Sequence, residues 1–337
     1  MEEDIYKTAG VNLSAAQSLK KRIRSLSSST LSPNVLEGSG SFSGLYELAG
    51  FREPIIVSST DGVGTKLKLA AMMNKYDTIG EDLVNACVND VIVCGAKPLF
   101  FLDYLALGEL NSCLIENLLS GMVRACRESE CSLIGGETAQ MPGLYGNNEF
   151  DMAGFVVGVV EKSNIIDTNL INQGDTILGL HSNGLHTNGY SLVRHILELE
   201  KDPTPLTKFR DDLGETLGEA LLTPHRSYYK LIRPAIPFIK GIAHITGGGL
   251  TENVPRILPK TLAAQFDTTS WRPPNIFKTL QNLGDISTTE MYRVFNMGLG
   301  MIIVCDPSNI QTIKALIPEV NVVGEVTTSL AGQRINL

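Results

Sequence analysis

The sequence lacks the short motifs that mark several common enzyme classes. It has no G-x-x-x-x-G-K-[ST] phosphate loop, no G-x-S-x-G nucleophile elbow and no H-E-x-x-H zinc motif. The glycines at positions 38, 40 and 44 miss the G-x-G-x-x-G spacing of dinucleotide-binding proteins. A nucleotide site in this chain must therefore be built from another pattern.

Cysteine pairs and long apolar runs are also missing. The 337 residues include six cysteines, and none has the C-x-x-C spacing of a structural zinc site. No stretch approaches the ~18 apolar residues of a membrane span. The acidic opening Met1–Asp4 differs from the basic start of a signal peptide. These absences predict a cytoplasmic protein with reduced thiols and no membrane partner.

A basic surface is absent as well, because the net charge is −8. This excludes nucleic acid as an expected partner, since binding a phosphate backbone needs clustered basic residues. The length predicts two domains, with a boundary in the polar segment near Asp167. We expect domains over residues 1–167 and 168–337. Strand and helix patterns mix in both halves without a regular β-α-β alternation, so the expected fold class is α/β, of the α+β type.

Local patterns place the regular elements. In the first half we expect strands over 54–59, 99–107, 132–135 and 150–160, and helices over 15–26, 65–73, 78–95 and 111–129. In the second half we expect strands over 176–180, 242–246, 262–266, 301–305 and 320–326, with helices between them. The glycine loop Gly38–Gly44 is interpreted equally well as a linker or as a lid over a ligand.

One turn combines groups that suit a nucleotide phosphate. Asp61 follows a predicted strand, Gly62 and Gly64 allow a tight backbone, and Thr65 and Lys66 begin a helix. Backbone N–H groups at a helix start bind phosphate, and a carboxylate beside them needs a cation such as magnesium. Taken alone, the turn is better explained as an Asp-capped bend, because Asp and Gly dominate turns.

Three further acids favour the phosphate interpretation. Asp90 lies in an apolar helical stretch, Asp103 interrupts an apolar strand, and Glu137 follows a predicted strand beside two glycines. A carboxylate in such a place is costly to bury unless it is paired, hydrogen-bonded or bound to a metal. Several of them together fit a divalent-ion site.

The chain resembles the phosphoribosylformylglycinamidine cyclo-ligase (aminoimidazole ribonucleotide synthetase) family. The blocks that carry the resemblance occur in family order: Tyr6–Val11, Ser59–Lys66, Val88–Asp90, Gly95–Tyr104, Gly135–Gly143, His186–Leu192, His244–Gly249 and Glu290–Met301. Each block is weak alone, and together they are specific along nearly the whole chain. The glycine loop at 38–44 departs from the family pattern, because serines intervene in it.

The resemblance implies a reaction, a fold and an assembly. The reaction is the ATP-dependent cyclisation of formylglycinamidine ribonucleotide to aminoimidazole ribonucleotide, with release of ADP and phosphate, in purine biosynthesis. The fold is a two-domain α/β fold in a homodimer, whose N-terminal strands close a barrel across the two subunits. The N-terminal domain, 1–167, would serve ATP, magnesium and dimerisation, and the C-terminal domain, 168–337, would bind substrate.

Residue roles follow from the matching blocks. Asp61, Asp90, Asp103 and Glu137 would hold Mg²⁺, and Asp61, Lys66, Asp90 and Glu137 form the predicted catalytic set. The expected ATP-phosphate contacts are Gly62, Val63, Gly64, Thr65 and Lys66, although Lys66 is also explained as a helix start. The expected substrate contacts are His186, Thr187, Asn188, Gly189, Thr246, Gly247, Gly248 and Gly249. For Asn188 a helix cap is nearly as good an explanation, and for His186 a hydrogen-bonded turn is.

Two other functions compete with this prediction. A thiamin-monophosphate kinase would share the acidic residues but lack the glycine blocks of the second half and the run Gly136–Gly143. A non-catalytic nucleotide-binding protein would have no reason to keep so many costly carboxylates beside glycine turns. ADP release that depends on formylglycinamidine ribonucleotide separates the three.

Overall fold

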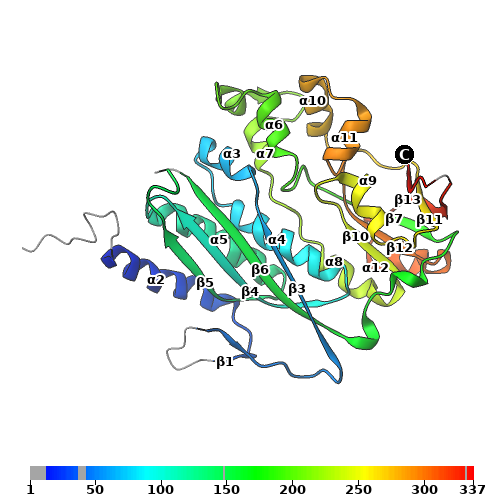
Figure 1. Ribbon diagram of the computed structural model, residues 1–337, viewed down its shortest axis with the longest axis horizontal. Helices are drawn as coiled ribbons and strands as arrows, with labels where there is room; N and C mark the ends of the chain where they lie inside the picture. Colours follow the sequence, from blue (N-terminus) through cyan, green and yellow to red (C-terminus); the bar gives the residue numbers. More distant parts are fainter. Residues whose placement is uncertain (1–12, 37–42, 147–148, 331) are drawn as a thin grey trace, which may run out of the picture. The chain divides into compact units, whose positions relative to one another are not determined.

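The computed structural model describes residues 13–36, 43–146, 149–330 and 332–337 (Figure 1). The chain divides into two compact units, Met1–Val91 with Lys97–Val159, and Ile92–Ala96 with Val160–Leu337. The sequence predicted a domain boundary near Asp167, which is eight residues after Val159, the last residue of the first unit. Residues 38–42 of the glycine loop, for which a lid and a linker competed, lie outside the described residues, as does the block Tyr6–Val11.

The first unit is built on one mixed sheet. Its strands are β1 (Val35–Leu36), β2 (Leu45–Tyr46), β3 (Pro54–Gly62), β4 (Lys97–Leu107), β5 (Ser132–Gln140) and β6 (Phe150–Glu161). Its helices are α2 (Leu13–Ser27), α3 (Lys66–Met73), α4 (Ile79–Ile92) and α5 (Ser112–Glu128). The main sheet has the order β3-β6-β4-β5, with β4 antiparallel to β6 and parallel to β5. Strands β1 and β2 form a separate antiparallel pair.

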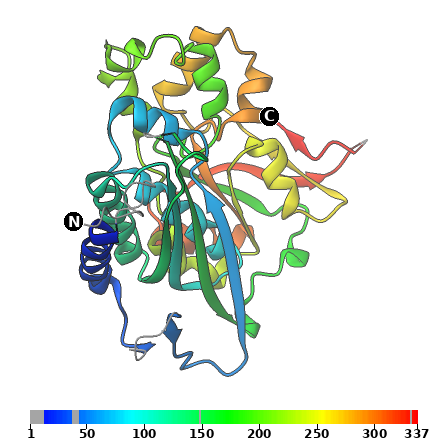
Figure 2. The same cartoon turned by 60° about the vertical axis from the view of Figure 1, so that its left-hand side comes forward.

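Helices α4 and α5 cover one face of this sheet (Figure 2). A Cβ on Gly154 of β6 would lie 2.4 Å from Phe101 and 3.0 Å from the Cys87 sulfur, so α4 packs directly on β4 and β6. The side chain of Asn111 caps α5 by accepting a 3.1 Å hydrogen bond from the Leu114 N–H. The predicted strands and helices are confirmed here, but β3 and β5 run further than expected. Consequently Asp61 and Glu137 lie inside strands rather than after them.

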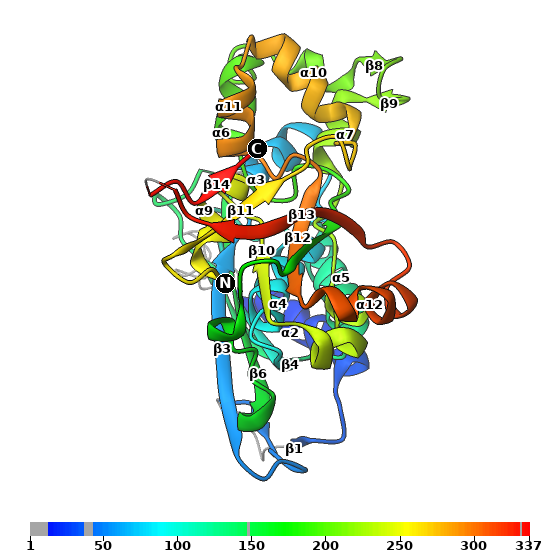
Figure 3. The same cartoon turned by 90° about the vertical axis from the view of Figure 1, so that its right-hand side faces the viewer.

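The second unit contains a larger sheet. Its strands are β7 (Thr176–His181), β8 (Phe209–Arg210), β9 (Glu215–Thr216), β10 (Gly241–His244), β11 (Leu262–Phe266), β12 (Leu299–Cys305), β13 (Asn321–Thr328) and β14 (Ile335–Asn336). Its helices are α6 (Tyr190–Ile196), α7 (Leu217–Leu222), α8 (Tyr229–Ile232), α9 (Gly249–Asn253), α10 (Asn275–Gly284), α11 (Thr288–Val294) and α12 (Ile310–Leu316). Figure 3 labels β10, β11, β12, β13 and β14 of the larger sheet, whose two central strands are β7 and β13.

This sheet has the order β10-β12-β7-β13-β11-β14, and β8 pairs with β9 separately. Neighbouring strands are antiparallel except β14, which runs parallel to β11 and was not expected from the sequence. Every residue of β12 and all but the last residue of β7 are buried, as expected for near-continuous apolar runs. In the part of the chain that the structure describes, no helix is long and apolar enough to cross a membrane.

Candidate active site

The Asp61–Lys66 turn links the end of β3 to α3. The Asp61 carboxylate accepts a 2.8 Å hydrogen bond from the N–H of the adjacent Gly62, whereas a helix cap or Asx turn would bond an N–H two or three residues on. Gly64 has φ +64°, a left-handed conformation that favours glycine. Helix α3 then starts at Lys66, one residue after the predicted start. The tight backbone and the helix start agree with the sequence, and phosphate binding by this turn stays a prediction.

The Lys66 side chain is buried in an ion pair. Its side chain is 0% exposed, and the ammonium is 2.8 Å from the carboxylate of Asp82 on α4, which is also 0% exposed. Burial lowers the pKa of Lys66, and the charge of Asp82 opposes that effect. Contact between Lys66 and a phosphate stays a prediction, and it requires this pair to open. In the arrangement described here, Lys66 instead fixes the start of α3 to α4.

Asp61 and Asp90 are both close enough to Cys87 for their charges to act on its thiol. The Ser59 hydroxyl donates a 3.2 Å hydrogen bond to the Asp90 carboxylate, and this joins β3 to α4. Burial raises the pKa of the Cys87 thiol, and the charges of Asp61 and Asp90 raise it further. The thiol therefore stays protonated.

Asp103 and Glu137 lie on adjacent strands, and both line a cavity. Asp103 pairs with Gly136 in the parallel β4–β5 register, one residue before Glu137. Burial raises the pKa of Asp103 to about 7, and the nearby Glu137 charge adds to the effect. A cavity of about 560 Å³ is lined by both acids and by Arg24 of α2. Its volume is in the range of small-molecule sites, which run from about 300 to 1,000 Å³.

The four predicted metal ligands do not form one tight cluster. Among the described residues, the metal-ligating atoms of three or more His, Cys, Asp or Glu side chains come within 4.8 Å of one another only at His186, His225 and His244. Magnesium usually takes one or two carboxylates from a protein and completes its shell with phosphates and water. One or two of the four acids would therefore be enough to hold the ion.

In the second unit, the two glycine-rich segments that were expected to face substrate lie next to each other. A Cβ on Gly247 would lie 3.2 Å from the side-chain oxygen of Asn188, so the segments 182–189 and 246–249 are in contact. Asn188 also donates a 3.5 Å hydrogen bond to the Thr187 hydroxyl. The sequence predicted that both segments face the substrate, and the fold brings them together.

Packing explains two of the glycines in these segments. A Cβ on Gly189 would lie 2.3 Å from the Phe295 ring, and one on Gly249 would lie 2.1 Å from the Tyr292 carbonyl oxygen. Both residues also have positive φ angles, +83° and +56°. A side chain would be strained at either position even with no ligand present. These glycines therefore do not by themselves indicate a binding site.

Two buried asparagines organise the segments, and the sequence did not single out either role. Asn253 donates hydrogen bonds to the carbonyl oxygens of Thr246, Gly247 and Gly249 at 2.9–3.4 Å. Asn296 accepts from the Ser182 hydroxyl at 2.8 Å and donates to the Gly184 carbonyl at 2.9 Å. Each asparagine has a buried side-chain amide that bonds backbone carbonyl groups of a glycine-rich turn. An asparagine close to such a turn is the sequence signal that could have identified these two residues.

His186 has two histidine neighbours. It lies before α6 with φ +62°, and its ring stacks on that of His225, with centroids 4.0 Å apart. His225 is joined to His244, the last residue of β10, by a 3.1 Å contact between their Nε2 atoms. The sequence predicted a site role for His186 alone among these three, and only the fold reveals that His225 and His244 meet it.

Comparison with known proteins covers both halves of the chain. The N-terminal domain of AIR synthase related proteins matches residues 49–160, and the C-terminal domain of the same proteins matches residues 172–334. Among solved structures, thiamine-monophosphate kinase from Stenotrophomonas maltophilia K279a has a TM-score of 0.66 at 17% identity over 95% of each chain. The hydrogenase maturation protein HypE in complex with ATP has a TM-score of 0.65 at 16% identity, covering 91% of this chain and 86% of its own. At these identities the structures show a shared fold.

Much closer relatives share about half of the residues. The phosphoribosylformylglycinamidine cyclo-ligase of Thermoanaerobacter sp. (strain X514) is 50% identical over 332 residues, 97% of this chain and 98% of the relative. The enzyme of the same name from Carboxydothermus hydrogenoformans is 49% identical over 342 residues, 99% of this chain and 98% of the relative. With both domain matches and this near-complete identity, the chain belongs to the phosphoribosylformylglycinamidine cyclo-ligase family of enzymes.

Proposed function

We propose that the protein catalyses the ATP-dependent cyclisation of formylglycinamidine ribonucleotide to aminoimidazole ribonucleotide, releasing ADP and phosphate, in purine biosynthesis. One observation carries the proposal, namely about 50% identity along nearly the entire chain to relatives named for this reaction. The fold alone is also found in a thiamine-monophosphate kinase, so it would not separate the two activities.

The first unit would bind ATP. One structural neighbour is described in complex with ATP, and a related kinase structure is described with AMPPCP. The backbone of Gly62, Val63, Gly64 and Thr65 would face the phosphates at the start of α3. Lys66 would either join these contacts when its pair with Asp82 opens, or hold the start of α3 in place from its buried position.

The four acids suit Mg²⁺ in number and in chemistry. Asp61, Asp90, Asp103 and Glu137 offer more than the one or two carboxylates that Mg²⁺ usually takes from a protein. Bound there, the ion would neutralise charge on the ATP phosphates. The raised pKa of Asp103 means that part of its population is protonated near pH 7 when no cation is nearby.

The chemistry converts an amide oxygen into a leaving group. The γ-phosphoryl group of ATP passes to the formyl-amide oxygen and leaves ADP. The amidine nitrogen then attacks the same carbon and loses a proton, and the C–O bond breaks to release phosphate as the ring closes. Such a transfer depends mainly on positioning and charge neutralisation, which the turn and the acids would supply.

The second unit would hold the rest of the substrate. Its two adjacent segments contribute His186, Thr187, Asn188 and Gly189, and Thr246, Gly247, Gly248 and Gly249 as the proposed contacts. Asn253 and Asn296 would keep the segment backbones in place, because each ties carbonyl groups of one segment. The hydroxyl and amide groups of Thr187 and Asn188 suit a ribose phosphate.

The exposed face of the first sheet supports a homodimer. Phe155 of β6 is 43% exposed and lies opposite Leu102 of β4, and Tyr104, two residues further along β4, is 36% exposed. Residues two apart on a strand share a face, so these side chains form one apolar surface together with Leu102. A second copy would cover it, and the resemblance implies a barrel made by the two sheets.

Free thiols at all six cysteines fit a reducing compartment such as the cytoplasm.

A coupled assay for ADP tests the proposal directly. Purified protein with ATP and Mg²⁺ should release ADP only when formylglycinamidine ribonucleotide is added, and the product should be aminoimidazole ribonucleotide by mass. Turnover on thiamin monophosphate instead would replace the proposal with a kinase. No turnover on either substrate would favour a non-catalytic nucleotide-binding protein.

A further inference from the structure

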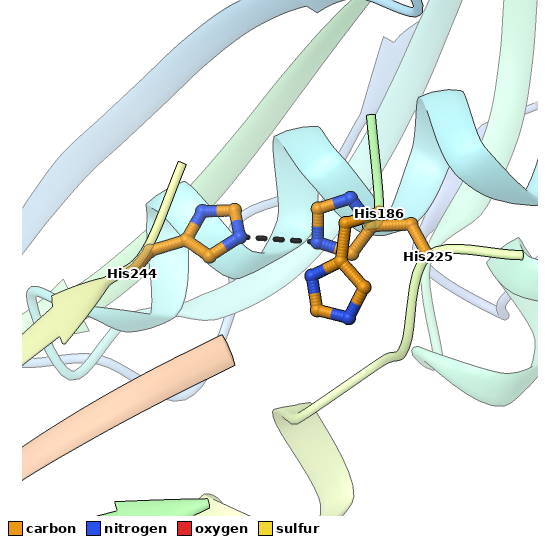
Figure 4. Close-up of side chains that lie close together, drawn as sticks. All are labelled: His186, His225 and His244. Atoms are coloured by element: carbon orange, nitrogen blue, oxygen red, sulfur yellow. Dashed lines mark hydrogen bonds between the residues drawn. The ribbon is translucent and has the colours of Figure 1, made fainter. Parts of the chain in front are cut away.

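The second unit brings three histidines together from distant parts of the sequence. His186 precedes α6, His225 follows α7, and His244 ends β10. Their exposed fractions are 1%, 1% and 6%, and one ring nitrogen of each lies within 4.8 Å of those of the others. Figure 4 shows the His186 ring against the His225 ring, with the His225–His244 contact dashed. Of these three histidines, only His186 has a role in the proposed reaction, as a substrate contact.

The spacing of the nitrogens is close to that of a metal-bound set. Zinc–nitrogen bonds of 2.0–2.1 Å in a tetrahedron separate two ligand nitrogens by roughly 3.3 Å. The Nε2 atoms of His225 and His244 are already 3.1 Å apart. The His186 ring stacks on His225 with 19° between the planes, so it must turn about its side-chain torsions to aim a nitrogen at the same point. That adjustment is small, because its ligand atom is already within 4.8 Å.

Neighbouring groups orient the ligands. The Thr187 hydroxyl is 3.4 Å from His225 Nδ1, and an Nδ1–H donated to it leaves the lone pair on Nε2, facing His244. Metal-binding histidines commonly have their second nitrogen held in this way. Gly300 leaves room for the His186 ring, because a Cβ there would lie 2.6 Å from His186 Cε1. The close packing suits a single ion rather than an organic ligand.

The three imidazole nitrogen ligands determine which metal ions the site would bind. Imidazole nitrogens bind borderline transition metals such as Zn²⁺, Co²⁺ and Ni²⁺, whereas Mg²⁺ prefers oxygen. Three histidines leave the fourth position of a tetrahedral Zn²⁺ for water or an anion. An anion there would offset the cost of placing a dication among neutral buried rings.

We propose that His186, His225 and His244 form a binding site for one transition-metal dication, such as Zn²⁺, separate from the acidic residues that suit Mg²⁺. His186 also belongs to a segment that would contact substrate, so bound Zn²⁺ should slow turnover. That consequence rests on the proposed function, whereas metal binding itself does not.

Co²⁺ is the probe for the test. The full-length protein is freed of metal with a chelator, and Co²⁺ is added in the presence of excess Mg²⁺. We expect one Co²⁺ per chain, with the strong visible absorption of a tetrahedral nitrogen site, and displacement of that Co²⁺ by Zn²⁺. His225→Ala should weaken binding at least about tenfold, and Thr187→Val should weaken it less, because it removes only the group that orients His225.

Matched controls decide the outcome. His195→Ala removes an exposed histidine of α6, and Asp90→Asn removes a carboxylate of the first unit. Both should leave Co²⁺ binding unchanged, and circular dichroism should show that every variant is folded. Should His225→Ala fail to fold, His225→Gln takes its place. Absence of tetrahedral Co²⁺ absorption, or equal binding by the folded His225 variant, would overturn the proposal.

Discussion

The two sheets of the molecule differ in how their faces are covered. In the second unit every residue of β12 is buried, so both faces of that strand are covered. In the first unit α4 and α5 cover one face, while the other carries Phe155 and Tyr104, which are 43% and 36% exposed. An apolar sheet face of this kind marks an interaction surface. Strand β12 is thus covered within one chain, whereas the first sheet has an exposed apolar face that the proposed dimer would cover.

The burial of the ion pairs differs between the units in the opposite direction, and breaking these pairs gives the largest expected effect. Lys66–Asp82 in the first unit is wholly buried, whereas Lys240–Asp175 in the second, also at 2.7–2.8 Å, has a 21% exposed lysine. Lys66→Met should lower the free energy of unfolding by about 3–5 kcal/mol, because it leaves a buried, unpaired carboxylate. Lys240→Met should cost less, about 1–2 kcal/mol, because Asp175 is also buried but keeps a 2.8 Å hydrogen bond from the Asn172 N–H.

Urea unfolding of both variants measures this difference. The double variant Lys66→Met/Asp82→Leu should recover most of the lost stability, since it removes both charges. Equal losses for Lys66→Met and Lys240→Met would mean that the first pair is hydrated in solution.

Removing one of the predicted metal-binding carboxylates should have the next largest effect, which is a loss of turnover. Asp90→Asn and Glu137→Gln should each reduce turnover by about 100- to 1,000-fold and weaken the dependence on Mg²⁺, through lost charge neutralisation at the phosphates. Glu128→Gln, at an exposed position of α5, is the matched control. ADP release measured over a range of Mg²⁺ concentrations gives the comparison. Near-normal rates in both variants would remove these acids from the site.

A charge on the open sheet face should separate the subunits. Phe155→Asp should weaken the dimer at least about 100-fold, because an aspartate there would be buried without a partner. Phe209→Asp is the matched control, since Phe209 is a 63% exposed phenylalanine of the second unit. Light scattering after size exclusion should show half the mass for the first variant only. An unchanged mass for Phe155→Asp would place the contact between subunits elsewhere.

The smallest expected effect is a pH dependence from Asp103. Its pKa is raised to about 7 in the folded protein, above the ordinary value of 3.8. The folded state therefore holds this proton more tightly than the unfolded state does. The resulting stability is fully present below about pH 4 and is lost as the pH rises to about 7. We expect a decline on the order of 2 kcal/mol in chelator, after allowing for solvent near the carboxylate.

Thermal unfolding between pH 4 and pH 8 measures this decline, and Asp103→Asn should flatten it. Acids elsewhere in the chain also titrate in this range, so the informative quantity is the difference between wild type and variant. Identical pH profiles would show that Asp103 has an ordinary pKa in solution.

Much of the fold could be predicted because local patterns determine it. The apolar run at 99–107 gave β4, and the apolar run at 301–305 gave most of β12. The short strand β14 was not expected, because its two residues are ordered only by pairing with β11. The strand extensions that contain Asp61 and Glu137 were missed for the same reason, since glycines and acids are poor strand formers without a neighbouring strand.

The sequence by itself determined the family, the order of the elements and which residues are chemically unusual, because those properties lie in residue type and short spacing. Only the tertiary structure decided what the unusual residues touch. Lys66 pairs with Asp82, 16 positions away, and His186 meets His225 and His244, 39 and 58 positions away. Contacts across such distances depend on how whole elements pack, and no local pattern encodes that packing.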